Sequence, residues 1–482
     1  MSLARLWASL AILLPVVAAL AATLSAVDLT YHLRAGEQIL GGGGIPRVDT
    51  FTFSAAGRDW VDQQWGAQAI LAATYRLAGW TGLVVLRAAL VGLLFGLLFL
   101  ACRLRGADIR LAAWLSLTAF IVTAPALALR PQLLGMVLLA VTLVLVTVRR
   151  THARLFYLVP VVVAVWANVH GSFFLGPVVL GLAWVEDVHE RVPSASRTLM
   201  VAVVAALATL LNPFGPTVWA YAVGLSTNPD VTSRIIEWQP TTLRTIPGIL
   251  FFASALAVAV VLARRSRPVG WPTLAWLGAF FVVGAYAIRG VAWWPLGAAF
   301  AVARVLGRTA AAATPERPIA VTARRINVAI VAAVVAVGIA LLPVWRATDP
   351  VLGAPSGVLT DAPSGLTAAL RATARPGDRA FNPQPWGSWF EFAIPELPVA
   401  IDSRIELFPV ETWDDYETVV SGGDGWQAIL DRWQVTMVVA RPGDDAFIQR
   451  LHGAGWRDAY ADRDGIVLTS PGRGADAVGT FQ

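Results

Sequence analysis

Eleven long apolar runs constrain the fold of this chain more than any other feature. A helix needs about 20 apolar residues to cross a bilayer, with about 17 as a practical minimum and fewer inside a bundle. Such runs lie near residues 6–26, 81–102, 111–127, 133–148, 155–169, 172–186, 198–212, 248–263, 271–288, 290–304 and 326–344. With 57% hydrophobic and 14% charged residues, the composition is far from that of a soluble domain. The sequence therefore predicts an all-α polytopic membrane bundle of about 11 transmembrane helices.

The positions of the arginines predict the orientation of the chain in the membrane. The chain contains no lysine, so all 37 of its Lys and Arg residues are arginine. Alternate connections, together with Arg5, hold 17 of them, in "CRLRGADIR", "RRTHAR", "DVHERVPSASR", "RRSR" and segment 304–325. The positive-inside rule assigns these connections to the cytoplasm, with the N-terminus, and places the chain after residue 345 outside. The predicted location is a bacterial cytoplasmic (inner) membrane. We interpret the first run as a retained span, since its apolar length exceeds the roughly 7 to 15 residues of a signal peptide.

Two outer connections are long, at residues 27–80 and 213–247. The first should hold a helix from Asp28 to about Leu40 that continues the first span, and then a break at "GGGGIP". A second amphipathic helix follows in "WVDQQWGAQAILAATYRLAG", suited either to the outer leaflet or to a re-entrant packing element. These loops are assigned with the spans to a membrane domain, residues 1–345.

Residues 346–482 are predicted to form an extracytoplasmic α/β domain. "SGLTAALRATA" and "GWQAILDRWQ" have helical spacing, whereas "VAID", "TMVVAR" and "GIVLTS" are short strand-like runs. This tail carries 19 acids and 11 arginines, which fits a domain held away from anionic lipid. In "AIDSRIEL", Asp402 and Arg404 are expected to form an ion pair within the domain.

Ionisable residues gather at the outer helix ends and in the outer loops. A charge at membrane depth costs roughly 2.5–3.5 kcal/mol on insertion scales, so such residues mark function more often than surface residues do. The candidates are Asp28, His32, Arg34, Arg130, His170, Glu237 and Arg289. Several separate segments thus direct polar groups at one outer surface.

Asp28 and His32 are four residues apart in "VDLTYHL", which stacks them on one face of a helix. A carboxylate beside an imidazole can be an ion pair, a general base with its orienting partner, or half of a metal site. Asp28 could instead be a helix N-cap. An N-cap does not need His32, which favours the functional interpretation.

Arg130 in "LRPQLLG", His170 in "ANVHG" and Arg289 in "AIRGVAWW" lie at tight outer turns. A guanidinium there can extend to lipid headgroups or bind a phosphate with two hydrogen bonds. Glu237 in "RIIEWQP" could reach the same cavity or act as an interfacial anchor. The three turns together suggest a shared anion site.

Several motifs are absent from the sequence. It has no P-loop, no dinucleotide fingerprint, no H-E-x-x-H and no cysteine-based metal pattern, and its one cysteine, Cys102, lies in an apolar run. A nucleotide-driven pump is therefore disfavoured. No cofactor is predicted, and a divalent metal has no support.

An outer Asp directly after the first span, a long first outer loop, many spans and an extracytoplasmic tail resemble the GT-C class of membrane glycosyltransferases. The resemblance is to the bacterial branch with protein mannosyltransferase-like and lipid A aminoarabinose transferase-like members, and it covers residues 1–345 in architecture. "HLRAGEQIL", "GIPRVDTFTFSAAGRDWVDQQW", "LRPQL", "WANVHGSF", "NPFG", "FNPQPWGSWFEF" and "VAIDSRIELF" are similar to strings of a widespread bacterial subgroup.

The resemblance implies a polyprenyl-phosphate-linked sugar donor, used on the outer face, with Asp28 as general base on the acceptor. The acceptor would be an envelope glycan, lipid or protein, and no nucleic acid is implied. Many members have a second acid beside the first, but Val27 and Leu29 flank Asp28. The resemblance therefore does not imply a metal ion that bridges the protein and the donor. Two other hypotheses remain, a transporter or flippase of lipid-linked intermediates and a non-catalytic envelope assembly protein.

Overall fold

The computed structural model describes residues 1–266, 268–307 and 321–473. The chain forms two compact units, the first made of Met1–Ala22 with Gly82–Trp345 and the second of Thr23–Thr81 with the tail from Arg346. The structure thus groups the first outer loop with the tail, whereas the sequence analysis kept that loop with the spanning helices. Arg267, Arg308 and Arg317 of the predicted inner connections lie outside the described residues.

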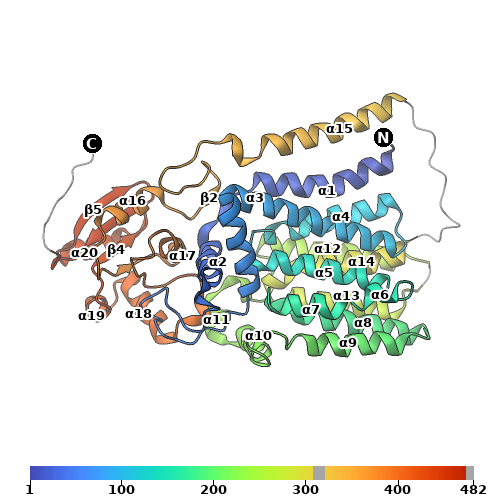
Figure 1. Ribbon diagram of the computed structural model, residues 1–482, viewed down its shortest axis with the longest axis horizontal. Coiled ribbons are helices and arrows are strands. Elements are labelled where there is room, and N and C mark those ends of the chain that lie inside the picture. The colour runs from blue at the N-terminus through green and yellow to red at the C-terminus, as the bar shows by residue number, and fades with distance from the viewer. Residues whose placement is uncertain (267, 308–320, 474–482) are drawn as a thin grey trace. The chain divides into compact units, whose positions relative to one another are not determined.

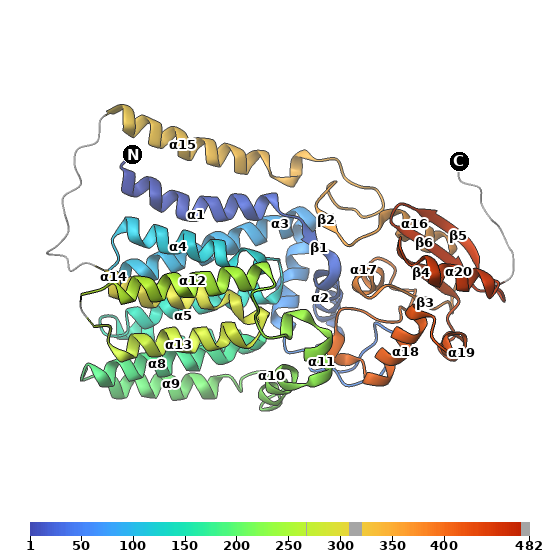
Figure 2. The ribbon, with the colours of Figure 1, turned by 180° about the vertical axis from the view of Figure 1, so that it is seen from behind.

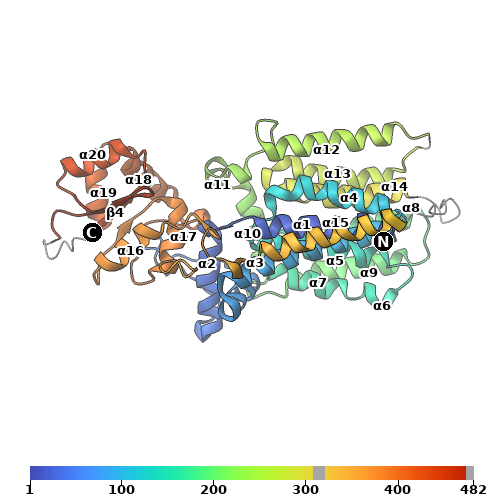
Figure 3. The ribbon, with the colours of Figure 1, turned by 90° about the horizontal axis from the view of Figure 1, so that it is seen from above.

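The first unit is a helical bundle in which the long helices run roughly parallel (Figure 1). Each predicted apolar run coincides with a helix or, at 155–169, with a helix pair. The helices are α1 (Leu3–Ala21), α3 (Trp65–Leu104, from Gly82), α4 (Ile109–Thr123), α5 (Pro131–Thr147), α6 (Ala153–Phe156), α7 (Val159–Ala167), α8 (Leu175–His189), α9 (Ala195–Ala208), α12 (Ile246–Ala263), α13 (Trp271–Tyr286), α14 (Trp294–Leu306) and α15 (Val321–Ala340). Figure 3 shows α13 beside α14.

Six helices of the described residues are long and apolar enough to cross a membrane, and several shorter apolar helices accompany them. The prediction of a multi-pass membrane protein is therefore confirmed, while the count of eleven spans stays a prediction. Short turns join the helices: η2 (Ala124–Ala126), η3 (Gly171–Phe174) and η5 (Ile288–Ala292). The long connection after α9 holds α10 (Thr217–Thr227), α11 (Pro229–Arg234) and η4 (Ile236–Trp238).

At the end of α5 away from Arg130, arginines and acids form a buried network. Arg149 lies 2.8 Å from Asp187 and 3.0 Å from Glu186, and Arg105 lies 3.0 Å from Glu186. Arg304 of α14 also pairs with Glu186. Several arginines that carry the positive-inside signal are therefore matched by carboxylates, and the network ties α3, α5, α8 and α14 together.

The second unit begins with a short strand rather than with a continuation of the first span. β1 (Leu24–Ser25) pairs in parallel with β2 (Leu359–Thr360), and α2 (Ala26–Gln38) follows, ending in a π-helical turn, η1 (Ile39–Gly43). The predicted helix from Asp28 to about Leu40 is confirmed by α2 and η1, but it does not continue the first span, because β1 interrupts the chain and pairs with the tail. The predicted amphipathic helix is confirmed as the first part of α3, which ends at a break in the helix at Ala78 and Gly79.

The tail contains a four-stranded sheet in the order β3-β4-β6-β5. The elements of the tail, besides β2, are α16 (Ser364–Thr373), β3 (Ala380–Phe381), α17 (Gln384–Ala393), η8 (Ile405–Leu407), α18 (Val410–Ser421), α19 (Trp426–Arg432), β4 (Met437–Ala440), α20 (Asp445–Gly453), β5 (Arg457–Asp462) and β6 (Gly465–Thr469). The last turn of the first unit, η7 (Pro343–Trp345), directly precedes the tail. The predicted helices and the strands in "TMVVAR" and "GIVLTS" are confirmed. "VAID" is no strand, because Val399 makes only single bridges, to Thr52 and Ala380.

The packing of α2 explains why the loop and the tail form one unit. α17 lies beside α2 (Figure 2). On another side, a Cβ added at Gly36 would lie 2.2 Å from the carbonyl oxygen of Gln68, so only glycine lets α2 approach α3 this closely. The helix that carries Asp28 is thereby fixed within the second unit.

Candidate functional site

A pocket with two arginines opens at one end of the first unit. It has a volume of about 270 Å³ and is lined by the end of α4, the start of α5, η4, the start of α12 and η5. Arg130 lies directly before Pro131, which begins α5, and Arg289 lies in η5. Gln132 donates a hydrogen bond of 3.3 Å to the carbonyl oxygen of Arg289, which fixes the two turns to each other.

Glu237 bridges the two guanidinium groups. Its Oε1 lies 2.9 Å from Nη1 of Arg130, and its Oε2 lies 3.6 Å from Nε of Arg289. Arg289 is also held over the ring of Trp238 at 5.1 Å. Burial raises the pKa of Glu237, but the charges of Arg289 and Arg130 outweigh it and lower that pKa overall. The pocket thus already holds one anionic group between two cations.

His170 lies nearby but is not among the residues that line this pocket. Its Nδ1 accepts a hydrogen bond of 3.1 Å from the backbone N–H of Ser172 and lies 2.7 Å from the Ser172 hydroxyl. Burial, followed by the charge of Arg289, lowers the pKa of His170 to about 3. The imidazole is therefore neutral at physiological pH, and any role in binding an anion is as a hydrogen-bond donor through Nε2.

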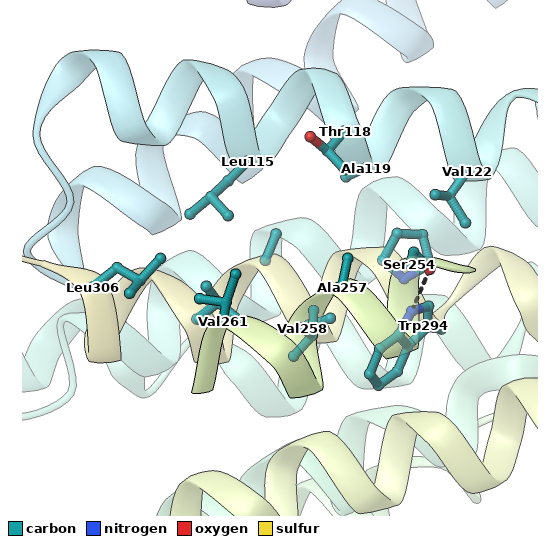
Figure 4. A pocket seen from close by; sticks show the side chains of 14 residues that line it. Leu115, Thr118, Ala119, Val122, Ser254, Ala257, Val258, Val261, Trp294 and Leu306 are labelled. Atoms are coloured by element: carbon teal, nitrogen blue, oxygen red, sulfur yellow. Dashed lines mark hydrogen bonds between the residues drawn. The ribbon is translucent and has the colours of Figure 1, made fainter. Parts of the chain in front are cut away.

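An apolar groove runs between α4, α12 and α14 (Figure 4). Leu115 and Val122 of α4 face Ala257 and Val261 of α12 across it, and Leu306 of α14 lies at its far end. Its volume is about 190 Å³. The Trp294 indole donates a hydrogen bond of 2.9 Å to the Ser254 hydroxyl, which satisfies both polar groups and leaves an apolar wall.

The groove and the arginine pocket adjoin. Val122 belongs to the walls of both, and Ala292 of the pocket is two residues from Trp294 of the groove. An apolar groove therefore lies next to a pocket with two guanidinium groups. This arrangement suits a molecule with a long hydrocarbon chain and an anionic head.

The other candidates, Asp28, His32 and Arg34, lie on α2 in the second unit. Ser25, not Asp28, is the N-cap of this helix, because its Oγ accepts from the backbone N–H of Val27. Asp28 is half-buried and His32 is buried at 2% exposure. The Gln68 amide nitrogen lies 3.4 Å from Nδ1 of His32, and the guanidinium of Arg34 lies 4.3 Å from the ring centre of Phe51.

A buried charge cluster beneath α2 joins the first loop to the tail. Arg404 lies 2.7 Å from Asp49 and 3.8 Å from Glu391, and its Nε donates a hydrogen bond of 2.9 Å to Asp402. The predicted pair of Asp402 and Arg404 is thus confirmed. Burial, and then the charge of Asp402, raises the pKa of Glu391 well above its ordinary value.

Asp62 is a further buried acid in this unit, at 2% exposure. Its Oδ1 accepts a hydrogen bond of 2.6 Å from the Gln68 amide, and burial raises its pKa to about 7. Since a free Asp has a pKa of about 3.9, the native protein binds more protons than the unfolded chain between about pH 4 and 7. This group therefore favours folding most below pH 4, and that contribution is lost as the pH rises to about 7.

Asp62→Asn is expected to reduce the pH dependence of stability, because asparagine cannot titrate. Between pH 5 and 7 the wild type should lose up to about 1.4 kcal/mol per pH unit from this group. Thermal unfolding of the full-length protein at pH 5, 6 and 7 measures the slope. Asp59→Asn, at an exposed position of the same loop, should retain the wild-type slope. An unchanged slope in Asp62→Asn would contradict the expectation.

Within residues 1–266, 268–307 and 321–473, no group of three or more His, Cys, Asp or Glu side chains is arranged to hold a metal ion. The structure brings Arg130, Glu237 and Arg289 together and, separately, places Asp28, His32 and Arg34 on one helix. Sequence reasoning missed the groove and the charge cluster of Arg404, because both depend on contacts between distant segments.

Comparison with solved structures identifies the fold. No family model and no curated protein matches the chain. ArnT from Cupriavidus metallidurans bound to undecaprenyl phosphate is similar with a TM-score of 0.53 and 14% identity, over 96% of this chain and 97% of that one. The archaeal oligosaccharyltransferase AglB from Archaeoglobus fulgidus, in complex with an inhibitory peptide and a dolichol-phosphate, gives 0.53 and 12%, over 91% and 70%. The chain has the fold of GT-C membrane glycosyltransferases, as the sequence resemblance implied.

Proposed function

We propose that this protein transfers a sugar from a polyprenyl-phosphate-linked donor to an envelope glycan, lipid or protein on the outer face of the bacterial cytoplasmic membrane. The observation that carries the proposal is the arginine pocket that adjoins the apolar groove at Val122. In the proposed topology, the pocket lies at the outer end of the bundle and the network of Arg149 and Asp187 at the cytoplasmic end.

The donor's two parts match the two parts of the site. A polyprenyl chain is apolar and would lie in the groove between α4, α12 and α14. Its phosphate would bind Arg130 and Arg289, because guanidinium groups match phosphate oxygens with directed, charge-assisted hydrogen bonds. The fold neighbours ArnT and AglB bind undecaprenyl phosphate and dolichol-phosphate, which belong to the same chemical class.

In the proposed reaction, the acceptor hydroxyl attacks the anomeric carbon of the donor sugar. A bond forms between the acceptor oxygen and that carbon, and the bond from the carbon to the phosphate oxygen breaks. The hydroxyl proton passes to the carboxylate of Asp28, with His32 as its orienting partner. Negative charge grows on the departing phosphate, where Arg130 and Arg289 stabilise it.

Arg130→Ala and Arg289→Ala are each expected to weaken binding of undecaprenyl phosphate about 10- to 100-fold, because a hydrogen bond to a charged group contributes roughly 1.5–3 kcal/mol. Titration of the purified full-length protein with undecaprenyl phosphate measures the effect. Arg244→Ala, at an exposed position of the loop that carries Glu237, is the matched control and should bind as the wild type does. Equal affinity in all four proteins would refute the donor site.

A further inference from the structure

Residues of the tail hold the start of α2, which carries Asp28. The Ser403 hydroxyl donates a hydrogen bond of 2.8 Å to the carbonyl oxygen of Val27, the residue before Asp28. Just upstream, β1 pairs with β2, and the Ser25 hydroxyl donates to Asp361 at 2.9 Å. All of these groups belong to the second unit. The backbone on the N-terminal side of Asp28 is therefore fixed by side chains and a strand of the tail.

The segment that presents Ser403 is itself held in place. The Asn382 side chain, which is fully buried, accepts from the backbone N–H of Ala400 at 2.9 Å and donates to the carbonyl oxygen of Ile401 at 2.9 Å. The hydroxyl of Ser388 lies 2.9 Å from that of Ser403. Since α17 packs against α2, Ser388 and Ser403 form a relay of hydroxyl groups from one helix to the other.

Packing alone does not require a hydroxyl at position 403. A carbonyl in the first turn of a helix already accepts the N–H four residues later, and its second lone pair needs no partner. The hydrogen bond from Ser403 therefore fixes the orientation of the start of α2 and is not needed to satisfy a buried polar group. A displacement of about 1 Å in a catalytic group can cost on the order of a hundredfold in rate, so a bond beside the proposed base has a kinetic consequence.

We infer that Ser403 is a positioning residue for Asp28, and that the tail serves the reaction by holding the start of α2. The inference rests on the proposed function, in which Asp28 is the general base. It predicts that loss of the Ser403 hydroxyl lowers turnover and leaves donor binding intact, because the donor pocket is built from residues of the first unit.

Ser403→Ala is compared with Ser403→Thr, which keeps a hydroxyl, and with Ser421→Ala, an exposed serine of the tail, as the matched control. In Ser403→Ala we expect kcat to fall about tenfold, with KM for the lipid-linked donor unchanged. Hydrogen–deuterium exchange of the full-length protein should be faster in residues 24–34. Ser403→Thr should restore most of the turnover, and Ser421→Ala should match the wild type in both measurements.

The exchange measurement tests the role of Ser403 independently of the proposed function. Unchanged exchange in residues 24–34 of Ser403→Ala would show that the hydroxyl does not hold α2, which overturns the inference whatever the activity. Faster exchange with unchanged kcat would also overturn it. Full activity of Asp28→Asn would instead refute Asp28 as the general base. The exchange measurement would still show whether the Ser403 hydroxyl holds the start of α2. Ser388→Ala provides a second variant, expected to show the same changes with smaller amplitude.

Discussion

Asp28→Asn is expected to lower sugar transfer about 10²- to 10⁴-fold, the range typical for loss of a general base. Asparagine keeps the size of the side chain but cannot accept the acceptor's proton. Binding of undecaprenyl phosphate should not change, because Arg130 and Arg289 remain. The measurements are transfer from a polyprenyl-phosphate-linked sugar by the purified protein and mass spectrometry of envelope glycans and lipid-linked sugars in a deletion strain carrying the variant.

Asp59→Asn is the control for this variant, since Asp59 is an exposed acid of the same loop and should be dispensable. Wild-type transfer by Asp28→Asn would exclude Asp28 as the base. Glycans and lipid-linked sugars that do not change even in the deletion strain would favour an assembly protein. Intermediates retained on the cytoplasmic side, with no transfer in vitro, would favour a flippase.

Arg404→Ala is expected to cost about 3–5 kcal/mol of stability in the second unit, because removing one partner of a buried ion pair leaves the other charge uncompensated. Arg404 is 1% exposed, and the affected carboxylates are those of Asp49 and Asp402. The variant also loses contacts with the rings of Trp60, at 4.5 Å, and Phe51, at 4.7 Å. Thermal unfolding and limited proteolysis of the full-length protein measure the loss.

Arg463→Ala removes an arginine of the same tail whose side chain is 93% exposed, and it should leave the unfolding transition unchanged. The first loop should become sensitive to protease in Arg404→Ala together with the tail, since the cluster contains residues of both. Loss of the tail alone, with a resistant first loop, would show that the two segments fold independently.

The helices and turns of the first unit could be predicted because their causes are local. An apolar run of sufficient length specifies each helix, and Pro131 marks the start of α5 directly after Arg130. His170, the N-cap of η3, and Arg289, in η5, lie in short turns that separate two apolar runs of the sequence. The ion pair of Asp402 and Arg404 involves residues two positions apart and was predicted as well.

The remaining features depend on contacts that no local pattern encodes. Asp49 pairs with Arg404 across more than 300 residues, so the sequence gives no sign that the first loop belongs with the tail. Glu237 comes from an irregular loop, and its place between Arg130 and Arg289 depends on how three connections meet. "VAID" has the composition of a strand, but the turn that follows presents Ser403 and Arg404 to the first loop.

The pairing of β1 with β2 has a consequence for how the chain is made. Val27 meets Ser403 across 376 residues, so the first loop lacks its partner in the tail until those residues have been synthesised. At about 5–20 residues per second, that delay is roughly 20 to 75 s. Throughout this interval the apolar side chains of the loop that pack against the tail in the folded protein are exposed to proteases and to aggregation. A nascent chain that stalls before β2 would leave this loop permanently open to degradation.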